Sequence, residues 1–259
     1  MLTRRELLLS AASGIVAAQP RGLIQTPALE TERQKGDPQD QYETVTYDPA
    51  QIAALSRMSG RAIFEAWQRA LPGAMLTKAR TFVGNSRQKT PGEIAEFLKL
   101  FRLDLRDANG AYVPYCAAGI SYCATLAFAE AAGKPLLGQQ KLTALRTVAA
   151  DVDHYYFYPT VSCRDMMNIA EGRRRWVSRR AQPSVLPKPG WIVLFDWERT
   201  GNPNHCGIVQ NATASRVFTV EFNTSVTTGD QKNGGVVASK EREYDYILGF
   251  IATDQPPTV

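Results

Sequence analysis

Residues 205–223 read HCGIVQNATASRVFTVEFN and contain two β-prone runs, 205–211 and 217–223, separated by a short polar segment. Short runs rich in valine, isoleucine, phenylalanine and threonine, bounded by turn residues, are typical of strands. Two further runs of this kind are 191–197 and 246–252. The carboxy-terminal part of the chain is therefore predicted to form an antiparallel sheet.

Helical patterns dominate the chain before this sheet. The first begins at Asp48 as N-cap with Pro49 at the first helical position, and its apolar stripe, broken once at Gly60, consists of Ile52, Leu55, Met58, Ile63, Phe64 and Trp67. A second helix is predicted after Pro91. A third, over 117–132, is apolar nearly all round and must be buried.

Residues 139–180 are predicted to be mostly helical, with an interruption at 155–159. Helices that precede strands favour an α+β fold, with the amino-terminal helices packed on the carboxy-terminal antiparallel sheet. The expected folded unit is one catalytic domain over 48–259 with a helical amino-terminal extension.

The composition is that of an ordinary soluble globular protein, with 44% hydrophobic and 21% charged residues among 259. It disfavours wholesale disorder and a membrane bundle. The net charge of +5 suits an anionic partner. No aromatic ladder accompanies the basic cluster, so no nucleic-acid partner is predicted and a solvated helix face is expected for Arg173, Arg174, Arg175, Arg179 and Arg180.

The amino terminus has the pattern of an export signal. Arg4 and Arg5 precede an apolar stretch over 7–18 that is too short for a stable membrane span, and the small residues 16–18 resemble a cleavage site. We expect residues 1–18 to be a twin-arginine-like signal peptide and the polar residues 19–47 to be a flexible leader. The predicted location is the periplasm or the extracellular space.

A nucleophilic site is predicted from one cysteine and one histidine. Cys116 begins the buried third helix, where unpaired N–H groups and the helix dipole favour a thiolate. His205 lies where a loop enters a strand, a position expected to be exposed enough to act as base. Glu221 and Asn223 are two residues apart on the next predicted strand, so both are expected on one face, where they orient the imidazole.

The remaining cysteines and histidine are given no catalytic role. The four cysteines contain no C-x-x-C pair, so neither a metal site nor a cofactor is predicted. With Cys116 kept reduced, at most one disulfide can form among Cys123, Cys163 and Cys206, and the pairing stays open. The other histidine, His154, is interpreted as structural.

Several short motifs, in order, resemble those of the cysteine, histidine-dependent amidohydrolase/peptidase (CHAP) family. The motifs are PYCAAGISY (114–122), KPGWIVLF (188–195), NHCGIV (204–209), VEFNT (220–224), and GGVV (234–237) followed by Arg242 and YILGF (246–250). The resemblance covers roughly 112–252 and implies a papain-like fold of the CHAP or NlpC type. It implies Cys116 as nucleophile, His205 as general base and then acid, and Glu221 and Asn223 as orienting groups.

The same resemblance implies a monomeric hydrolase that cleaves amide bonds of peptidoglycan. The bond cut is left open: either the amide between the sugar and the first amino acid of the stem, or a peptide bond within the stem or cross-bridge. Two alternatives also stay open, an inactive wall-binding protein of the same fold and a papain-like amidase or acyltransferase on another substrate. An insertion relative to the family is expected at 137–163, and residues 107–110 are predicted to form an Asn-Gly turn rather than a calcium loop.

Overall fold

The structure, a computed structural model, describes residues 60–131, 134, 136–138, 140–150 and 159–254. The predicted signal peptide (1–18), leader (19–47) and helix start at Asp48 lie outside the described residues, as does His154.

The carboxy-terminal half forms one six-stranded antiparallel sheet, as the sequence predicts. The strand order is β1-β6-β2-β3-β4-β5. The strands are β1 (Trp176–Ser178), β2 (Ile192–Phe195), β3 (His205–Ala212), β4 (Val217–Thr224), β5 (Val236–Arg242) and β6 (Ile247–Ile251). A one-turn 3₁₀ helix, η3 (Tyr244–Tyr246), connects β5 to β6.

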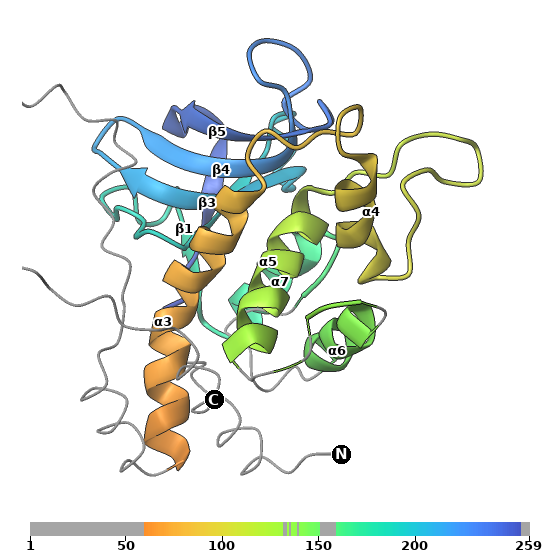
Figure 1. Ribbon diagram of the computed structural model, residues 1–259. Coiled ribbons are helices and arrows are strands. Elements are labelled where there is room, and N and C mark those ends of the chain that lie inside the picture. Colours follow the sequence, from red (N-terminus) through yellow and green to blue (C-terminus); the bar gives the residue numbers. More distant parts are fainter. Residues whose placement is uncertain (1–59, 132–133, 135, 139, 151–158, 255–259) are drawn as a thin grey trace, which may run out of the picture.

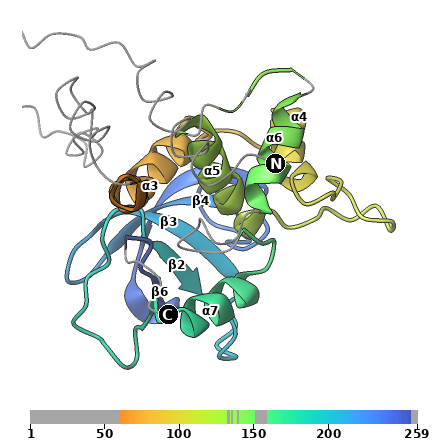
Figure 2. The same ribbon diagram turned by 90° about the horizontal axis from the view of Figure 1, so that it is seen from below.

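Five helices are present among the described residues: α3 (Gly60–Thr81), α4 (Pro91–Lys99), α5 (Cys116–Ala131), α6 (Gln140–Ala149) and α7 (Cys163–Gly172). Helices α3 and α5 run side by side and pack against β3 and β4 (Figure 1). Helices α4 and α6 pack on α5, whereas α7 contacts β1 and lies near β6 in the view from below (Figure 2). The predicted α+β class, with helices packed on an antiparallel sheet, is confirmed.

Two local predictions differ from the structure. The segment 176–178 was expected to be helical, but it is strand β1, which pairs with β6 through Trp176 and Ile251. A free edge of β6 supplies hydrogen-bond partners that a local pattern cannot reveal. Helix α3 also continues to Thr81, well beyond the predicted apolar stripe, and includes Pro72.

The basic cluster is also different from the expectation. Helix α7 ends at Gly172, so the arginines at 173–180 follow the helix instead of lining it. Arg175 is 1% exposed, and the prediction of a solvated face is wrong for this residue. None of the described helices combines the length and the apolar character needed to cross a bilayer.

Both faces of the sheet are covered by apolar side chains. The face toward α3 and α5 is formed by Ile192, Leu194, Cys206, Ile208, Val220 and Phe222. The opposite face carries Trp191, Val193, Phe195, Val209, Val217 and Phe250. This alternation follows from the period of two along each strand, and burial on both sides explains why the runs are almost continuously apolar.

Close contact between α5 and the sheet depends on Gly119. A Cβ atom at this position would lie 2.3 Å from Cδ1 of Phe222 on β4. We expect Gly119→Ala to lower the free energy of unfolding by about 1–3 kcal/mol, because the Phe222 ring must move within a packed core.

Urea denaturation of the variant and the parent chain measures this change. The matched control is Gly73→Ala in α3, where an added Cβ meets nothing within 4 Å. There the better helix propensity of alanine is expected to raise the free energy of unfolding by about 0.5–1 kcal/mol. A loss of the same size at both positions would contradict the proposed contact.

Candidate functional site

Cys116 is the first residue of α5, as predicted, and its segment is held by buried packing. Tyr115 and Ala117 on either side are both 0% exposed. The first N–H groups of a helix lack partners within the helix and form the positive end of its dipole. The position therefore favours a negatively charged sulfur and supplies N–H donors beside it.

His205 begins β3 and bonds to Glu221 on the neighbouring strand β4. The His205 Nε2 atom lies 3.0 Å from Oε2 of Glu221, and both side chains are fully buried. Glu221 in turn accepts hydrogen bonds from Nε of Arg242 (2.8 Å, to Oε1) and Nη2 of Arg242 (2.6 Å, to Oε2). This two-bond pairing fixes the carboxylate against the imidazole.

Gly207 leaves space for the Glu221 carboxylate, and Thr219 bonds to it. Gly207 lies opposite Glu221 in the strand pairing, and a Cβ there would come within 2.9 Å of Cγ of Glu221. Thr219, two residues earlier on β4, donates a hydrogen bond of 2.7 Å from Oγ1 to Oε1 of Glu221. The carboxylate is thus bonded on both oxygens, which restricts its orientation.

Cys116 and His205 interact directly and change each other's pKa. Hydrogen bonds with two neighbouring thiols and with His205 lower the pKa of Cys116 well below its ordinary value of 9.0, against the effect of burial. Burial disfavours the charged imidazole, but the hydrogen bond with Glu221 and the interaction with the nearby Cys116 sulfur outweigh it and raise the pKa of His205 to about 9. Both shifts act in the same direction, toward a thiolate on Cys116 and a protonated imidazole on His205.

The carboxylate of Glu221 stays ionised for a similar reason. Burial alone would raise the pKa of Glu221, but the hydrogen bonds and charges of Arg242 and His205 lower it to about 2. Because Glu221 uses Nε2 of the ring, Nδ1 is the nitrogen left to exchange a proton with the sulfur. This Nδ1 is buried and has no hydrogen-bond partner of ordinary geometry among the described residues.

The exposure of these groups differs from the prediction. His205 was expected to be exposed enough to act as base, yet it is 0% exposed, and Cys116 is 6% exposed. The Phe195 ring, whose centroid is 5.8 Å from that of the imidazole, packs over it from β2. A strand end can be buried when its neighbours carry large aromatic groups, and this cannot be read from the loop before it.

Asn223 takes a different place from Glu221. Its φ of 62° and a register shift between β4 and β5 interrupt the regular alternation that put both side chains on one face. Its Oδ1 accepts a hydrogen bond from Arg87, and its Nδ2 donates to the Lys232 carbonyl at 2.9 Å. The Arg87 guanidinium lies 5.6 Å from the ring centroid of Tyr115, so Asn223 supports the segment before Cys116, and its described hydrogen bonds do not include His205.

Two further sulfurs lie beside Cys116, which the sequence spacing does not reveal. The Sγ atoms of Cys116, Cys163 and Cys206 all lie within 4.8 Å of one another, and those of Cys116 and Cys163 are 3.8 Å apart. All four cysteines of the chain are free thiols. The fourth, Cys123, is buried within α5, and burial raises its pKa.

The predicted insertion supplies one of these sulfurs. Within 137–163, α6 packs on α5, and Thr160 is anchored to α5 because its N–H donates to Oγ of Ser121 (3.0 Å) and its carbonyl accepts from the same hydroxyl (2.8 Å). This anchor precedes α7 and brings its first residue, Cys163, to Cys116.

At the predicted turn 107–110, Oδ1 of Asp107 accepts hydrogen bonds from the N–H groups of Asn109 and Ala111, each of 2.9 Å.

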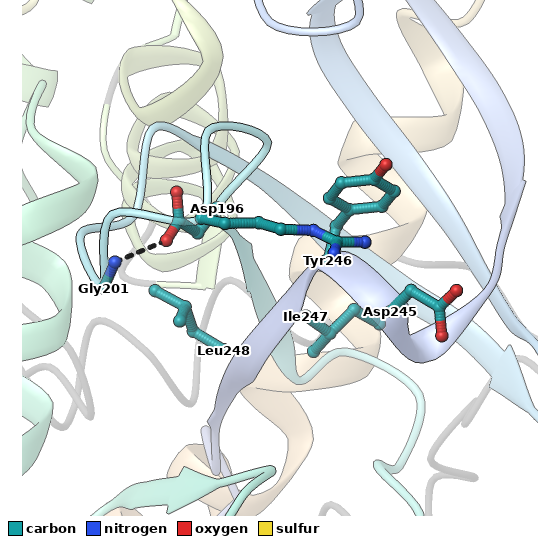
Figure 3. Close-up of a pocket in the computed structure, with 7 residues that line it drawn as sticks. Asp196, Gly201, Asp245, Tyr246, Ile247 and Leu248 are labelled. Carbon is teal, nitrogen blue, oxygen red and sulfur yellow. Dashed lines mark hydrogen bonds between the residues drawn. The ribbon is translucent and has the colours of Figure 1, made fainter.

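A pocket borders the loop that leads into His205 (Figure 3). It is lined from the β2–β3 loop by Asp196, Arg199 and Gly201, and from η3 and the start of β6 by residues 245–248. The Gly201 N–H donates to Asp196 at 2.6 Å, and the Arg199 guanidinium lies 4.9 Å from the Tyr246 ring centroid. Its lining includes neither Cys116 nor His205.

Sequence reasoning named Cys116, His205 and Glu221, and the structure brings these three together. Sequence reasoning gave no site role to Arg242, Cys163 or Cys206. Their proximity to the other site residues depends on strand register and on helix placement. Comparisons of the chain with protein-family models, curated proteins and solved structures find no match.

Proposed function

We propose that the chain is a cysteine hydrolase of the papain-like CHAP type that cleaves amide bonds of peptidoglycan. The observation that carries the proposal is that Cys116, at the start of α5, lies beside the strand where His205 bonds to Glu221 at 3.0 Å, because the Cys116 Sγ is within 4.8 Å of the Sγ of Cys206, the residue after His205. A thiolate, an imidazolium and an oriented carboxylate in this order are the groups that nucleophilic acyl transfer requires. The placement of the thiol at a helix N-terminus adds further support.

The proposed reaction has two steps. The Cys116 sulfur attacks the carbonyl carbon, and the N–H groups at the start of α5 stabilise the developing oxyanion. The imidazolium of His205 gives its proton to the leaving amine as the C–N bond breaks and a thioester forms. His205 then takes a proton from water, the hydroxide attacks the thioester, and the acid leaves while Cys116 is regenerated as thiolate.

Glu221 acts as a positioning residue in this scheme. It stays ionised throughout, holds the ring through Nε2 and stabilises the positive charge on His205. Since the Cys116 sulfur is nearly covered, the scheme also requires that substrate binding widen the site.

Peptidoglycan is proposed as substrate from three properties of the sequence. These are the resemblance to the CHAP family over 112–252, the export-signal pattern at the amino terminus, and the net charge of +5, which suits an anionic wall polymer. Cleavage of the sugar–peptide amide and cleavage within the peptide both fit the same chemistry, because the walls of the cleft decide specificity.

Product analysis of digested wall tests the proposal. Purified chain is incubated with peptidoglycan from several species, and the released fragments are identified by mass spectrometry, with Cys116→Ala as control. New amino groups without new reducing sugar ends, absent with the variant, are expected. If neither protein digests any wall but the parent chain hydrolyses a simple amide, the assignment changes to an amidase that acts on a non-wall substrate.

Selective alkylation provides a second test. At about pH 6 we expect iodoacetamide to modify Cys116 at least about tenfold faster than Cys123, because Cys116 is a thiolate whereas burial keeps Cys123 a neutral thiol. Peptide mapping of the alkylated chain measures both rates in one sample. Equal rates would favour the non-catalytic wall-binding protein.

A further inference from the structure

The proposed hydrolysis uses the sulfur of Cys116 but gives no role to the two other sulfurs beside it. We call Cys116, Cys163 and Cys206 the three-sulfur cluster. They come from α5, α7 and β3, and their Sγ atoms lie within 4.8 Å of one another. All three side chains are at least nine-tenths buried.

The spacing is close to that of thiolate ligands around one metal ion. A tetrahedral ion with metal–sulfur bonds of about 2.3 Å holds its sulfurs about 3.8 Å apart. The Cys116–Cys163 distance is 3.8 Å, and the other two distances lie within 4.8 Å. Side-chain shifts of about an ångström at Cys206 therefore complete a set of three ligands around one ion.

Two helix ends favour negative charge at the cluster. Cys116 and Cys163 are the first residues of α5 and α7, so two helix N-termini converge on the cluster. At α7 the Ser162 side chain caps the helix by accepting from the Asp165 N–H at 3.1 Å.

The chemistry of the set selects the kind of ion. The described ligand group contains three thiols and no carboxylate, and thiolates prefer zinc-like and softer ions to calcium or magnesium. We propose that Cys116, Cys163 and Cys206 together bind one thiophilic metal ion of the zinc and cadmium class. Metal binding itself does not require Cys116 to be a nucleophile. If Cys116 is the nucleophile of the proposed function, a bound ion blocks the hydrolase reversibly, and this consequence rests on the proposed function.

Cadmium is a suitable probe because thiolate-to-cadmium charge transfer absorbs in the ultraviolet. The full chain, reduced with a phosphine and kept free of air, is titrated with Cd²⁺, and bound cadmium is measured by elemental analysis. One ion per chain is expected, with the absorbance of three thiolates. Cys163→Ala and Cys206→Ala are each expected to remove about a third of the absorbance and to weaken binding about tenfold or more.

Cys123→Ala is the matched control, since it removes a buried cysteine outside the cluster. Its cadmium absorbance and affinity are expected to equal those of the parent. Thermal unfolding shows whether each variant is folded. If Cys163→Ala does not fold, Cys163→Ser is used in its place.

The inference would be overturned by an absorbance that corresponds to one thiolate and is unchanged in Cys163→Ala and Cys206→Ala. It would also be overturned if the chain bound no cadmium. A disulfide between two of the cluster cysteines that persists in the reduced sample counts against it in the same way. These outcomes leave wall cleavage by the metal-free chain untouched. Conversely, cadmium bound by three thiolates in a chain that digests no wall removes the proposed hydrolase and keeps the metal site.

Discussion

Cys116→Ala is expected to lower the rate of peptidoglycan cleavage by about 10⁴-fold or more while the chain keeps its fold. In the proposed reaction this sulfur forms the bond to the substrate carbonyl, and removal of the nucleophile from a nucleophile–base pair costs about this factor in comparable enzymes. The stability of the fold changes little, because Cys116 is a small residue at the start of a helix. Release of soluble fragments from wall, followed over time, measures the rate.

The matched variant for this test is Cys123→Ala, seven residues later in the same helix. Both positions are buried, but only Cys116 interacts with His205. Cys123→Ala is expected to retain nearly the full rate. If both variants digest wall as fast as the parent chain, Cys116 is not the nucleophile.

Glu221→Ala is expected to have the second largest effect, and it acts on stability as well as on rate. The substitution leaves His205 and Arg242 without the carboxylate that each contacts, and loss of one partner from a buried ion pair costs about 3–5 kcal/mol of unfolding free energy. The rate of wall cleavage should fall by about 10⁴-fold, as for the third member of other triads.

The stability loss should depend on pH in a defined direction. The pKa of Glu221 is lowered from 4.5 in the unfolded chain to about 2 in the folded one. The stability that its charge contributes is therefore fully present above about pH 4.5 and disappears as the pH falls toward about 2. The difference between parent and Glu221→Ala, measured by urea denaturation, should narrow across this window.

Two further variants make this test specific. Glu241→Ala removes an exposed carboxylate on β5 that lies 3.1 Å from Arg216, and such surface pairs contribute about 1 kcal/mol or less. Glu221→Gln keeps the shape and one acceptor oxygen, so it should recover part of the stability but little of the rate. A pH-independent loss in Glu221→Ala would contradict the charged contact.

Much of the fold was predictable because its signals are local. The apolar runs at 205–211 and 217–223 became β3 and β4, and the small apolar residues after Cys116 became the buried helix α5. Strand β1 was not predictable in this way. Its three residues follow a helix and become a strand only because β6 offers an unpaired edge.

The candidate site was predictable where a residue type and a local position suffice. Cys116 at a helix start, His205 at a strand start and Glu221 on the next strand meet these conditions. The burial of His205 and the pairing of Arg242 with Glu221 depend instead on register and on aromatic packing from β2. The altered direction of Asn223 results from a backbone irregularity that period-two reasoning omits.

The residues that set the reactivity of the thiol are distributed from the start of α5 to the end of β5. Contacts this distant in sequence require the ends of long loops to be brought together, so an unfolded chain does not hold them. A chain that has not yet folded therefore holds an ordinary, poorly reactive thiol at position 116. The reactivity of this thiol therefore arises only with the finished tertiary structure.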